Sequence, residues 1–121
     1  LSLFATKEEL NIVADQFGQP TNANDLAEAI MKIIKSEKIT PGIFNFSNLG
    51  RISWFDFAEK IAELSKAKIK LNAIETSQYP TPAKRPKNSV LDLDKISKTY
   101  AIQLKPWEES LEGCVQILQN N

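Results

Sequence analysis

A stiff basic segment near the end of the chain contains residues that could bind an anion. In "PTPAKRPKNS", residues 80–89, Lys84, Arg85 and Lys87 stand among three prolines. Proline fixes its own φ and moves the preceding residue out of the α region, so we expect residues 79–86 to form an extended loop. A planar guanidinium on such a backbone can bind phosphate with little loss of conformational freedom. Arg85 is therefore a candidate phosphate ligand, and the alternative is a solvated charge run without a ligand.

Two further loops carry polar side chains next to expected strands and helices, where ligands collect in α/β proteins. "NLGRISW", residues 48–54, offers Arg51, but helix capping by Ser53 and core packing of Trp54 explain this loop structurally. "DQFGQPT", residues 15–21, is open to two interpretations, a capped surface turn or part of a ligand site. Its hydrogen-bonding groups are Gln16, Gln19 and Thr21, and Gly18 would allow close approach.

Several residue types that common active sites need are missing or rare. The chain has no histidine, one cysteine and four glycines. Histidine bases, Ser-His and Cys-His nucleophiles, and imidazole or multi-cysteine metal sites are therefore excluded. The glycines cannot form a G-x-G-x-x-G turn or a P-loop. The acidic pairs, Asp92 with Asp94 and Glu108 with Glu109, stand at expected helix starts, where the helix dipole explains them. We predict no catalytic, cofactor-binding or metal-binding residue in this chain.

Length and composition predict one small globular domain. The 121 residues are 42% hydrophobic and 25% charged, which is sufficient for a core. Fifteen basic residues balance fifteen acidic ones, so overall charge gives no support to a nucleic-acid or membrane partner. The single Cys114 has an apolar setting, which fits a reducing, cytoplasmic compartment. Because Leu1 stands inside what reads as the end of an amphipathic helix, we expect the chain to be truncated.

Apolar periodicity predicts strands that alternate with helices, and hence an α/β arrangement. Asn22 is expected to cap one helix with Asp25 three residues later, and Ser53 and Asp56 to form a capping box. Pro106 should open the last helix, with Leu111, Val115 and Leu118 facing inward. The expected strands are 11–14, 43–47, 67–76 and 88–92, and the expected helices are 22 to about 37, 53–64, 92 to about 99, and one from 106.

Taken in order, four segments resemble the C-terminal part of the dTDP-4-dehydrorhamnose reductases, which are extended short-chain dehydrogenases. The segments are "VADQFGQPTNANDLAEAI", "GIFNFSNLGRISWFDFAEKIAE", "PTPAKRPKNSVLD" and "LDLDKISKTYAIQLKPWEESL". The resemblance covers essentially the whole chain. Its most specific motifs are "DQxGxPT" and "PTPAxRPxNSxLD", because the other motifs occur widely among extended short-chain dehydrogenases.

The resemblance implies an α/β substrate-binding part of a Rossmann-type enzyme that reduces dTDP-4-dehydro-6-deoxy-L-mannose to dTDP-L-rhamnose. In that family the N-terminal half binds NADPH or NADH and supplies the catalytic Thr or Ser, Tyr and Lys. Neither Tyr79 nor Tyr100 has a lysine four residues later, so this chain lacks the Y-x-x-x-K pair and is expected to be inactive alone. Its partners would be the dTDP-sugar and the N-terminal half, and a homo-oligomer is possible.

The resemblance also implies roles for individual residues. Arg85 matches the arginine that approaches the phosphates of the nucleotide sugar, and residues 16–21 match the loop at the pocket mouth. The expected substrate-binding residues are Arg85, Gln16, Gly18, Gln19, Thr21, Asn88 and Ser89. Two alternatives stay open: a non-catalytic subunit that binds a nucleotide sugar or a protein, and a reductase or epimerase for another nucleotide sugar.

Overall fold

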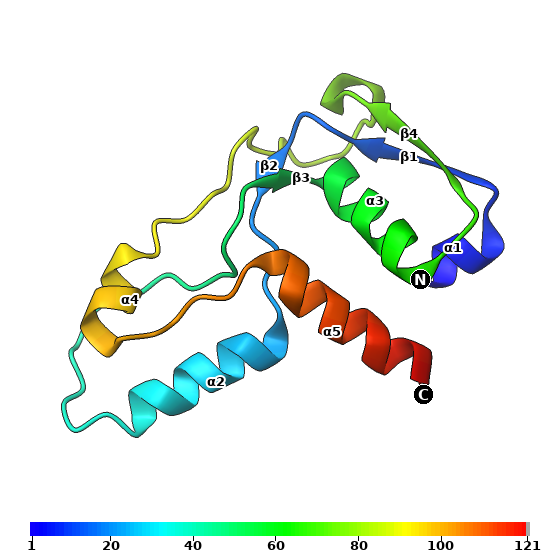
Figure 1. Cartoon of the computed structure of the whole chain (residues 1–121). Coiled ribbons are helices and arrows are strands. Elements are labelled where there is room, and N and C mark those ends of the chain that lie inside the picture. The colour runs from blue at the N-terminus through cyan, green and yellow to red at the C-terminus, as the bar shows by residue number, and fades with distance from the viewer. Residues whose placement is uncertain (121) are drawn as a thin grey trace.

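The chain folds as a mixed α/β structure with short strands, as the sequence predicts. The computed structural model describes residues 1–120, and none of the helices in that range is long and apolar enough to cross a membrane. In chain order the elements are α1 (Ser2–Thr6), β1 (Glu9–Val13), β2 (Phe17–Gly18), α2 (Ala23–Ile34), β3 (Ile52–Ser53), α3 (Trp54–Ser65), β4 (Lys70–Ile74), the 3-10 turn η1 (Thr76–Gln78), α4 (Asp94–Tyr100) and α5 (Trp107–Asn120) (Figure 1).

Two small sheets organise one end of the molecule. Strands β1 and β4 pair in parallel, with Leu10 opposite Leu71 and Val13 opposite Ile74. Strands β2 and β3 pair antiparallel over two positions, Phe17 with Ser53 and Gly18 with Ile52. Parallel strands need a long crossover between them, and α3 lies on that crossover. Helix α3 packs between the β1–β4 sheet and α5 (Figure 1).

Two of the four helix starts that the sequence predicts are capped by the expected side chain in the structure. The Asn22 side chain accepts hydrogen bonds from the backbone N–H groups of Asn24 and Asp25, at 2.8 and 3.4 Å, and so begins α2. At α3, Asp56 N–H donates to Ser53 Oγ at 3.1 Å and Ser53 N–H donates to Asp56 Oδ2 at 2.8 Å. This reciprocal pair is a capping box, which fixes where α3 begins.

A hydrophobic core joins α2 to α4 and to the segments that flank α4. Its buried members are Ala29, Ile96, Tyr100 and Ile102, and the partly buried Phe44 and Phe46 pack against them. The Tyr100 ring meets the Phe44 ring edge to face, with centroids 5.3 Å apart. Tyr100 Oη donates to the Thr40 carbonyl and accepts from the Thr40 N–H. Tyr100 is therefore a structural residue.

A buried polar cluster joins α2 to α5. Asn48 is 1% exposed, and its Nδ2 donates to Asp25 Oδ2 at 2.6 Å and to Ser110 Oγ at 2.9 Å. Ser110 Oγ also donates to Asp25, and Lys105 Nζ donates to Asp25 Oδ1 at 2.8 Å. Burial alone would raise the pKa of Asp25, but the hydrogen bonds from Lys105, Ser110 and Asn48 outweigh it and lower that pKa. Asp25 is therefore held as a buried carboxylate.

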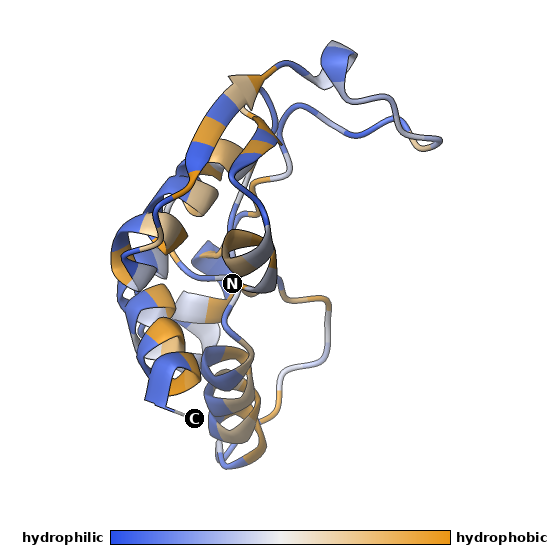
Figure 2. Cartoon of the chain, turned by 90° about the vertical axis from the view of Figure 1, so that its right-hand side faces the viewer, coloured by the Kyte–Doolittle hydropathy of each residue, from blue (hydrophilic) through white to orange (hydrophobic). Residues whose placement is uncertain are grey.

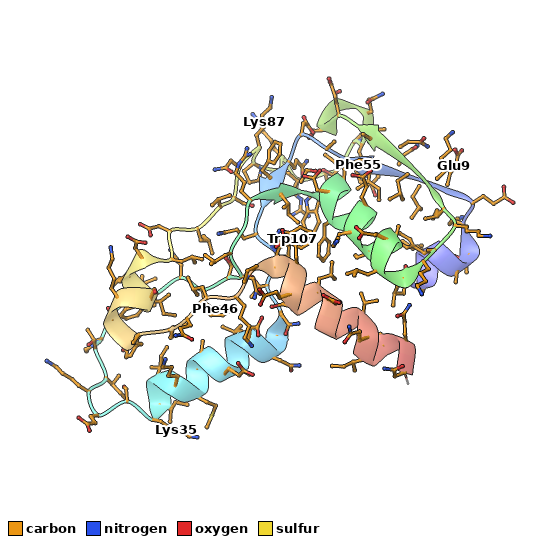
Figure 3. The ribbon with its side chains drawn as sticks, in the orientation of Figure 1. Glu9, Lys35, Phe46, Phe55, Lys87 and Trp107 are labelled. Carbon is orange, nitrogen blue, oxygen red and sulfur yellow. The ribbon has the colours of Figure 1, made fainter. Side chains whose placement is uncertain are left out.

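Helix α3 contacts α5 through a pair of aromatic rings. Trp107 stands at the start of α5 (Figure 3) and is 6% exposed. Its ring meets the Phe57 ring edge to face, with centroids 5.9 Å apart. Gly50 lies against this tryptophan, because a Cβ on Gly50 would stand 2.3 Å from Trp107 Cδ1. Gly50 also has a φ of 115°, which disfavours other residues. The turn before β3 is therefore built around Trp107.

Several details of the sequence prediction were wrong. Residues 43–47 form no strand: Phe44 and Phe46 do point inward, but the structure gives these residues no strand partner. Residues 88–92 contribute only an isolated bridge between Asn88 and Phe17. Helix α2 ends at Ile34, before residue 37, and the strand expected over 67–76 is confined to Lys70–Ile74. Leu118 is 58% exposed, so it does not face the core.

Two capping predictions also need correction. Asp25 is no capping-box partner of Asn22, because its carboxylate binds Asn48, Ser110 and Lys105 in place of the Asn22 backbone. Asp92 is not the residue directly before α4, because Leu93 takes that position and α4 begins at Asp94. The Asp92 side chain still accepts a hydrogen bond from Asp94 N–H at 2.9 Å.

Candidate binding site

A cavity of about 870 Å³ opens beside the two small sheets. It is lined by α1, β1, residues 16–20, the β3–α3 junction and parts of the segment 79–89. This segment extends away from the rest of the chain after β4 and η1 (Figure 2). Residues 79–89 are all exposed, so the wall of the cavity that they form is open to solvent. We refer to it as the open wall.

The structure brings together five of the seven predicted binding residues. They are Gln16, Gly18, Gln19, Arg85 and Ser89, which all line the cavity. Thr21 and Asn88 do not line it: Thr21 is an exposed residue just before α2, and Asn88 points its side-chain oxygen toward Arg51. The two loops that carry the five residues are more than 60 residues apart in the sequence.

Backbone hydrogen bonds hold these two loops together. Phe17 N–H donates to the Lys87 carbonyl and Ser89 N–H donates to the Phe17 carbonyl, both at 2.9 Å. Lys87 lies beside β2 (Figure 3). Leu91 N–H donates to Gln19 Oε1 at 2.7 Å, so this side-chain oxygen already has a partner. Gln19 therefore ties the loops together and also lines the cavity.

Gly18 permits the close approach of the two loops. A Cβ on Gly18 would stand 2.9 Å from Ser89 Oγ, which is closer than real Cβ atoms come. Ser89 Oγ in turn donates to the Phe17 carbonyl at 3.1 Å, so its position is fixed. The sequence predicted that Gly18 allows close approach, and what approaches it is Ser89 of the other loop.

The beginning of the exposed segment is anchored at Thr76. Asp15 Oδ1 accepts from Thr76 N–H at 2.8 Å and from Thr76 Oγ1 at 2.6 Å. Gln16 Nε2 donates to Thr76 Oγ1 at 3.0 Å. The hydrogen bond from the Thr76 side chain lowers the pKa of Asp15, and burial opposes this only in part. Asp15 and Gln16 therefore fix the point where the segment leaves η1.

Arg85 is exposed and lines the cavity, and none of the salt bridges within residues 1–120 involves it. A guanidinium has five N–H donors in a planar fork, which suits an oxygen-rich anion. Lys84 and Lys87 flank it in the sequence and add positive charge, although neither lines the cavity. The arrangement can hold a phosphate at the open wall.

Sequence reasoning missed two aromatic residues of the cavity. Trp54 and Tyr79 line it and are 60% and 56% exposed. Trp54 was assigned to core packing, and that assignment is wrong. Helical side chains lean toward the N-terminus, so the first residue of α3 covers the space before the helix, which here is the cavity. The position of Trp54 directly after the capping residue Ser53 was the signal that could have revealed this.

The described residues contain no cluster that could hold a metal ion. No group of three or more His, Cys, Asp and Glu side chains in the range 1–120 converges in a suitable way. The four glycines, at positions 18, 42, 50 and 113, form no glycine-rich turn.

The comparisons with known proteins agree with this architecture. Residues 1–120 match the family model described as "RmlD substrate binding domain". The chain is 42% identical over 127 residues to dTDP-4-dehydrorhamnose reductase of Sinorhizobium fredii, which covers 98% of the chain and 43% of that relative. The reductase of Escherichia coli K12 is 38% identical over 117 residues, covering 89% of the chain and 39% of the relative.

Solved structures give the same result. A dTDP-4-dehydrorhamnose reductase from Clostridium acetobutylicum matches with a TM-score of 0.89 and 36% identity, over 98% of this chain and 41% of that one. The Bacillus anthracis reductase in complex with NADP matches with a TM-score of 0.85 and 35% identity, over 92% and 39%. The chain thus spans about two fifths of the length of its relatives. It belongs to the RmlD substrate-binding domain family.

Proposed function

We propose that this chain is one domain, the substrate-binding domain of a dTDP-4-dehydrorhamnose reductase. It binds dTDP-4-dehydro-6-deoxy-L-mannose and orients the 4-keto carbon for reduction by NADPH to dTDP-L-rhamnose. The observation that carries the proposal is the cavity, which is lined by Arg85, by two exposed aromatic side chains and by the polar loop 16–19. The family membership supports the choice of substrate.

Each wall of the cavity suits one part of a nucleotide sugar. Arg85 can form charge-assisted, bidentate hydrogen bonds to a diphosphate. Trp54 and Tyr79 offer flat apolar faces to a base or a sugar ring. Gln16 and Ser89 add polar side chains to the lining of the cavity. Thr21 and Asn88 lie outside the lining, so we propose that they act on the ligand only through the loops that carry them.

The chemistry of reduction belongs to the N-terminal half of the reductase. The glycines of the chain form no glycine-rich turn for the phosphates of NADPH, so we propose that the N-terminal half binds the cofactor and carries the catalytic step. The contribution of this chain is to bind the sugar nucleotide in one orientation, which brings the reacting atoms together in advance. The isolated chain is accordingly expected to have no reductase activity.

Replacement of Arg85 tests the proposal in the complete reductase. The Arg85→Ala variant should raise KM for the dTDP-sugar and Kd for dTDP by about tenfold or more, because a charge-assisted hydrogen bond is lost. Lys84→Ala is the matched control, since it removes one positive charge from the adjacent position that does not line the cavity. An unchanged KM and Kd in Arg85→Ala would refute the assignment of Arg85.

The alternative function is a non-catalytic subunit that binds a nucleotide sugar. The coding sequence upstream of Leu1 separates the two. A glycine-rich strand-turn-helix and a Y-x-x-x-K pair in that sequence would support the reductase. A translation start at Leu1 would support the binding subunit instead, as would micromolar affinity of the 121-residue chain for dTDP in calorimetry.

A further inference from the structure

We propose that Arg51 is a positioning residue that keeps Arg85 in place for the ligand. This inference rests on the proposed function of Arg85. Arg51 does not line the cavity, so it would act without touching the ligand. It acts through Phe17 and Asn88, the two residues at which the cavity loops are bridged.

Arg51 lies across the junction between the two loops. Its Cζ atom is 3.7 Å from the centre of the Phe17 ring, which is close enough for a cation-π contact. Its Nε donates to Asn88 Oδ1 at 3.4 Å. A single side chain therefore contacts both members of the Phe17–Asn88 bridge, and it comes from a third segment, directly before β3.

The position of Arg85 depends on this junction because the exposed segment is held only near its ends. One attachment is at Thr76, through Asp15 and Gln16. The other is at residues 87–91, through the hydrogen bonds to Phe17 and Gln19. In the range 80–86 the one hydrogen bond made is local, from Thr81 Oγ1 to the Ala83 carbonyl at 2.8 Å.

Arg85 stands close to the second attachment. Two residues, Pro86 and Lys87, separate it from Asn88, and Pro86 restricts the backbone between the two. We therefore expect a displacement of Asn88 to move the backbone from which the Arg85 side chain extends. The β2–β3 ladder beneath it is only two residue pairs long, so it gives the junction little rigidity of its own. Arg51 adds side-chain contacts to this weak ladder.

Arg51 itself is exposed, so its removal should leave the fold intact. This separates a positioning role from a structural one. The role predicts weaker ligand binding with little change in thermal stability. It also predicts that the effect disappears when Arg85 is absent, because residues that act as one unit are not additive.

A double-mutant cycle in the complete reductase tests the inference, with dTDP as the probe in calorimetry. Arg51→Ala should raise Kd for dTDP by about three- to tenfold in the presence of Arg85, and by less than about twofold in the Arg85→Ala background. Arg51→Lys should recover part of the affinity, because an ammonium can still lie over the Phe17 ring. The melting temperature of each Arg51 variant should stay within about 2 °C of the parent.

A second measurement follows the junction without any ligand. Trypsin should cleave the Lys87–Asn88 bond faster in Arg51→Ala than in the parent, because Asn88 has lost its side-chain partner. Arg85–Pro86 resists trypsin, and cleavage at Lys84–Arg85, which lies outside the junction, should proceed equally in both proteins and serves as the internal reference. Mass spectrometry tells the two cleavage sites apart. Faster cleavage with weaker dTDP binding is the result expected.

The outcomes that would overturn the inference are distinct from those that would overturn the proposed function. If Arg85→Ala weakens dTDP binding but Arg51→Ala does not, Arg51 has no positioning role. An equal loss of affinity in both backgrounds would also exclude it, because Arg51 would then act independently of Arg85. If Arg85→Ala leaves dTDP binding unchanged, both the assignment of Arg85 and the role of Arg51 fail.

Discussion

The Asn48 amide donates a 2.6 Å hydrogen bond to the carboxylate of Asp25, and both residues are buried. Asn48 comes from the loop before β3 and Asp25 from the first turn of α2. Ser110 of α5 contacts both of them, and Asn22 N–H donates to Asn48 Oδ1 at 2.8 Å. The Asn48 amide therefore links the loop before β3 to α2 and to α5.

Asn48→Ala is expected to destabilise the chain by about 1–3 kcal/mol, because it removes one of the three donors to the buried Asp25 and leaves the Asn22 N–H without a partner. The free energy of unfolding in urea measures this. Asn45→Ala is the matched control, since Asn45 is exposed and donates only to the Asp92 carbonyl. Its effect should stay within about 0.5 kcal/mol. Equal effects of the two variants would contradict the role of Asn48.

The stability that Asp25 contributes should depend on pH. Its pKa in the folded chain is lowered, so its stabilisation is fully present above the unfolded pKa of about 3.9 and is lost as the pH falls through the folded value. We expect the parent to be more stable than Asp25→Asn at pH 7, and the gap to close in acid. Urea unfolding of both proteins at several pH values measures it. A gap that stays constant down to pH 2 would be inconsistent with this assignment.

Gly18→Ala should strain the junction between the two loops. The added methyl group would stand 2.9 Å from Ser89 Oγ, so this hydroxyl must rotate and give up its hydrogen bond to the Phe17 carbonyl, which costs about 0.5–1.5 kcal/mol. Ser89→Ala removes the obstacle, so the double variant should be destabilised by less than the sum of the single variants. Urea unfolding of the three variants gives the comparison. If the effects of the two single variants simply add, the contact between the new methyl group and Ser89 Oγ is not the cause of the destabilisation.

The two tryptophans should behave in opposite ways. Trp107→Ala removes a buried ring that packs on Phe57, and should cost about 3–5 kcal/mol of stability. Trp54→Ala removes an exposed ring at the cavity, and should cost less than about 1 kcal/mol while weakening dTDP binding in the complete reductase. Urea unfolding and calorimetry separate the two effects. Unchanged dTDP affinity in Trp54→Ala would remove this residue from the site.

Local signals in the sequence predicted much of the fold. The capping residues Asn22 and Ser53 act within three residues of their partners, so their effect is readable from the sequence alone. The alternation at 43–47 misled because two inward phenylalanines satisfy a core without a partner strand. Strand formation needs a hydrogen-bonding neighbour, and the sequence of one segment does not contain that information.

The site was predictable in its residue types but not in its assembly. The basic segment and the polar loop could be recognised by composition. Their connection rests on hydrogen bonds such as Phe17 N–H to the Lys87 carbonyl, which join residues 70 positions apart. The same holds for Arg51, whose contacts with Phe17 and Asn88 arise only when three distant segments meet. Long-range contacts of this kind leave no local pattern.

Because the exposed segment is attached only near its two ends, the sequence of its middle part can change without disturbing the attachments. Residues 80–83 at its tip touch neither the core nor the anchors, so insertions or substitutions there alter the cavity rim at small risk to folding. The anchors at Thr76 and Asn88 can stay constant meanwhile. Evolution can in this way change which ligand the cavity accepts by altering a few rim residues, while both attachments stay the same.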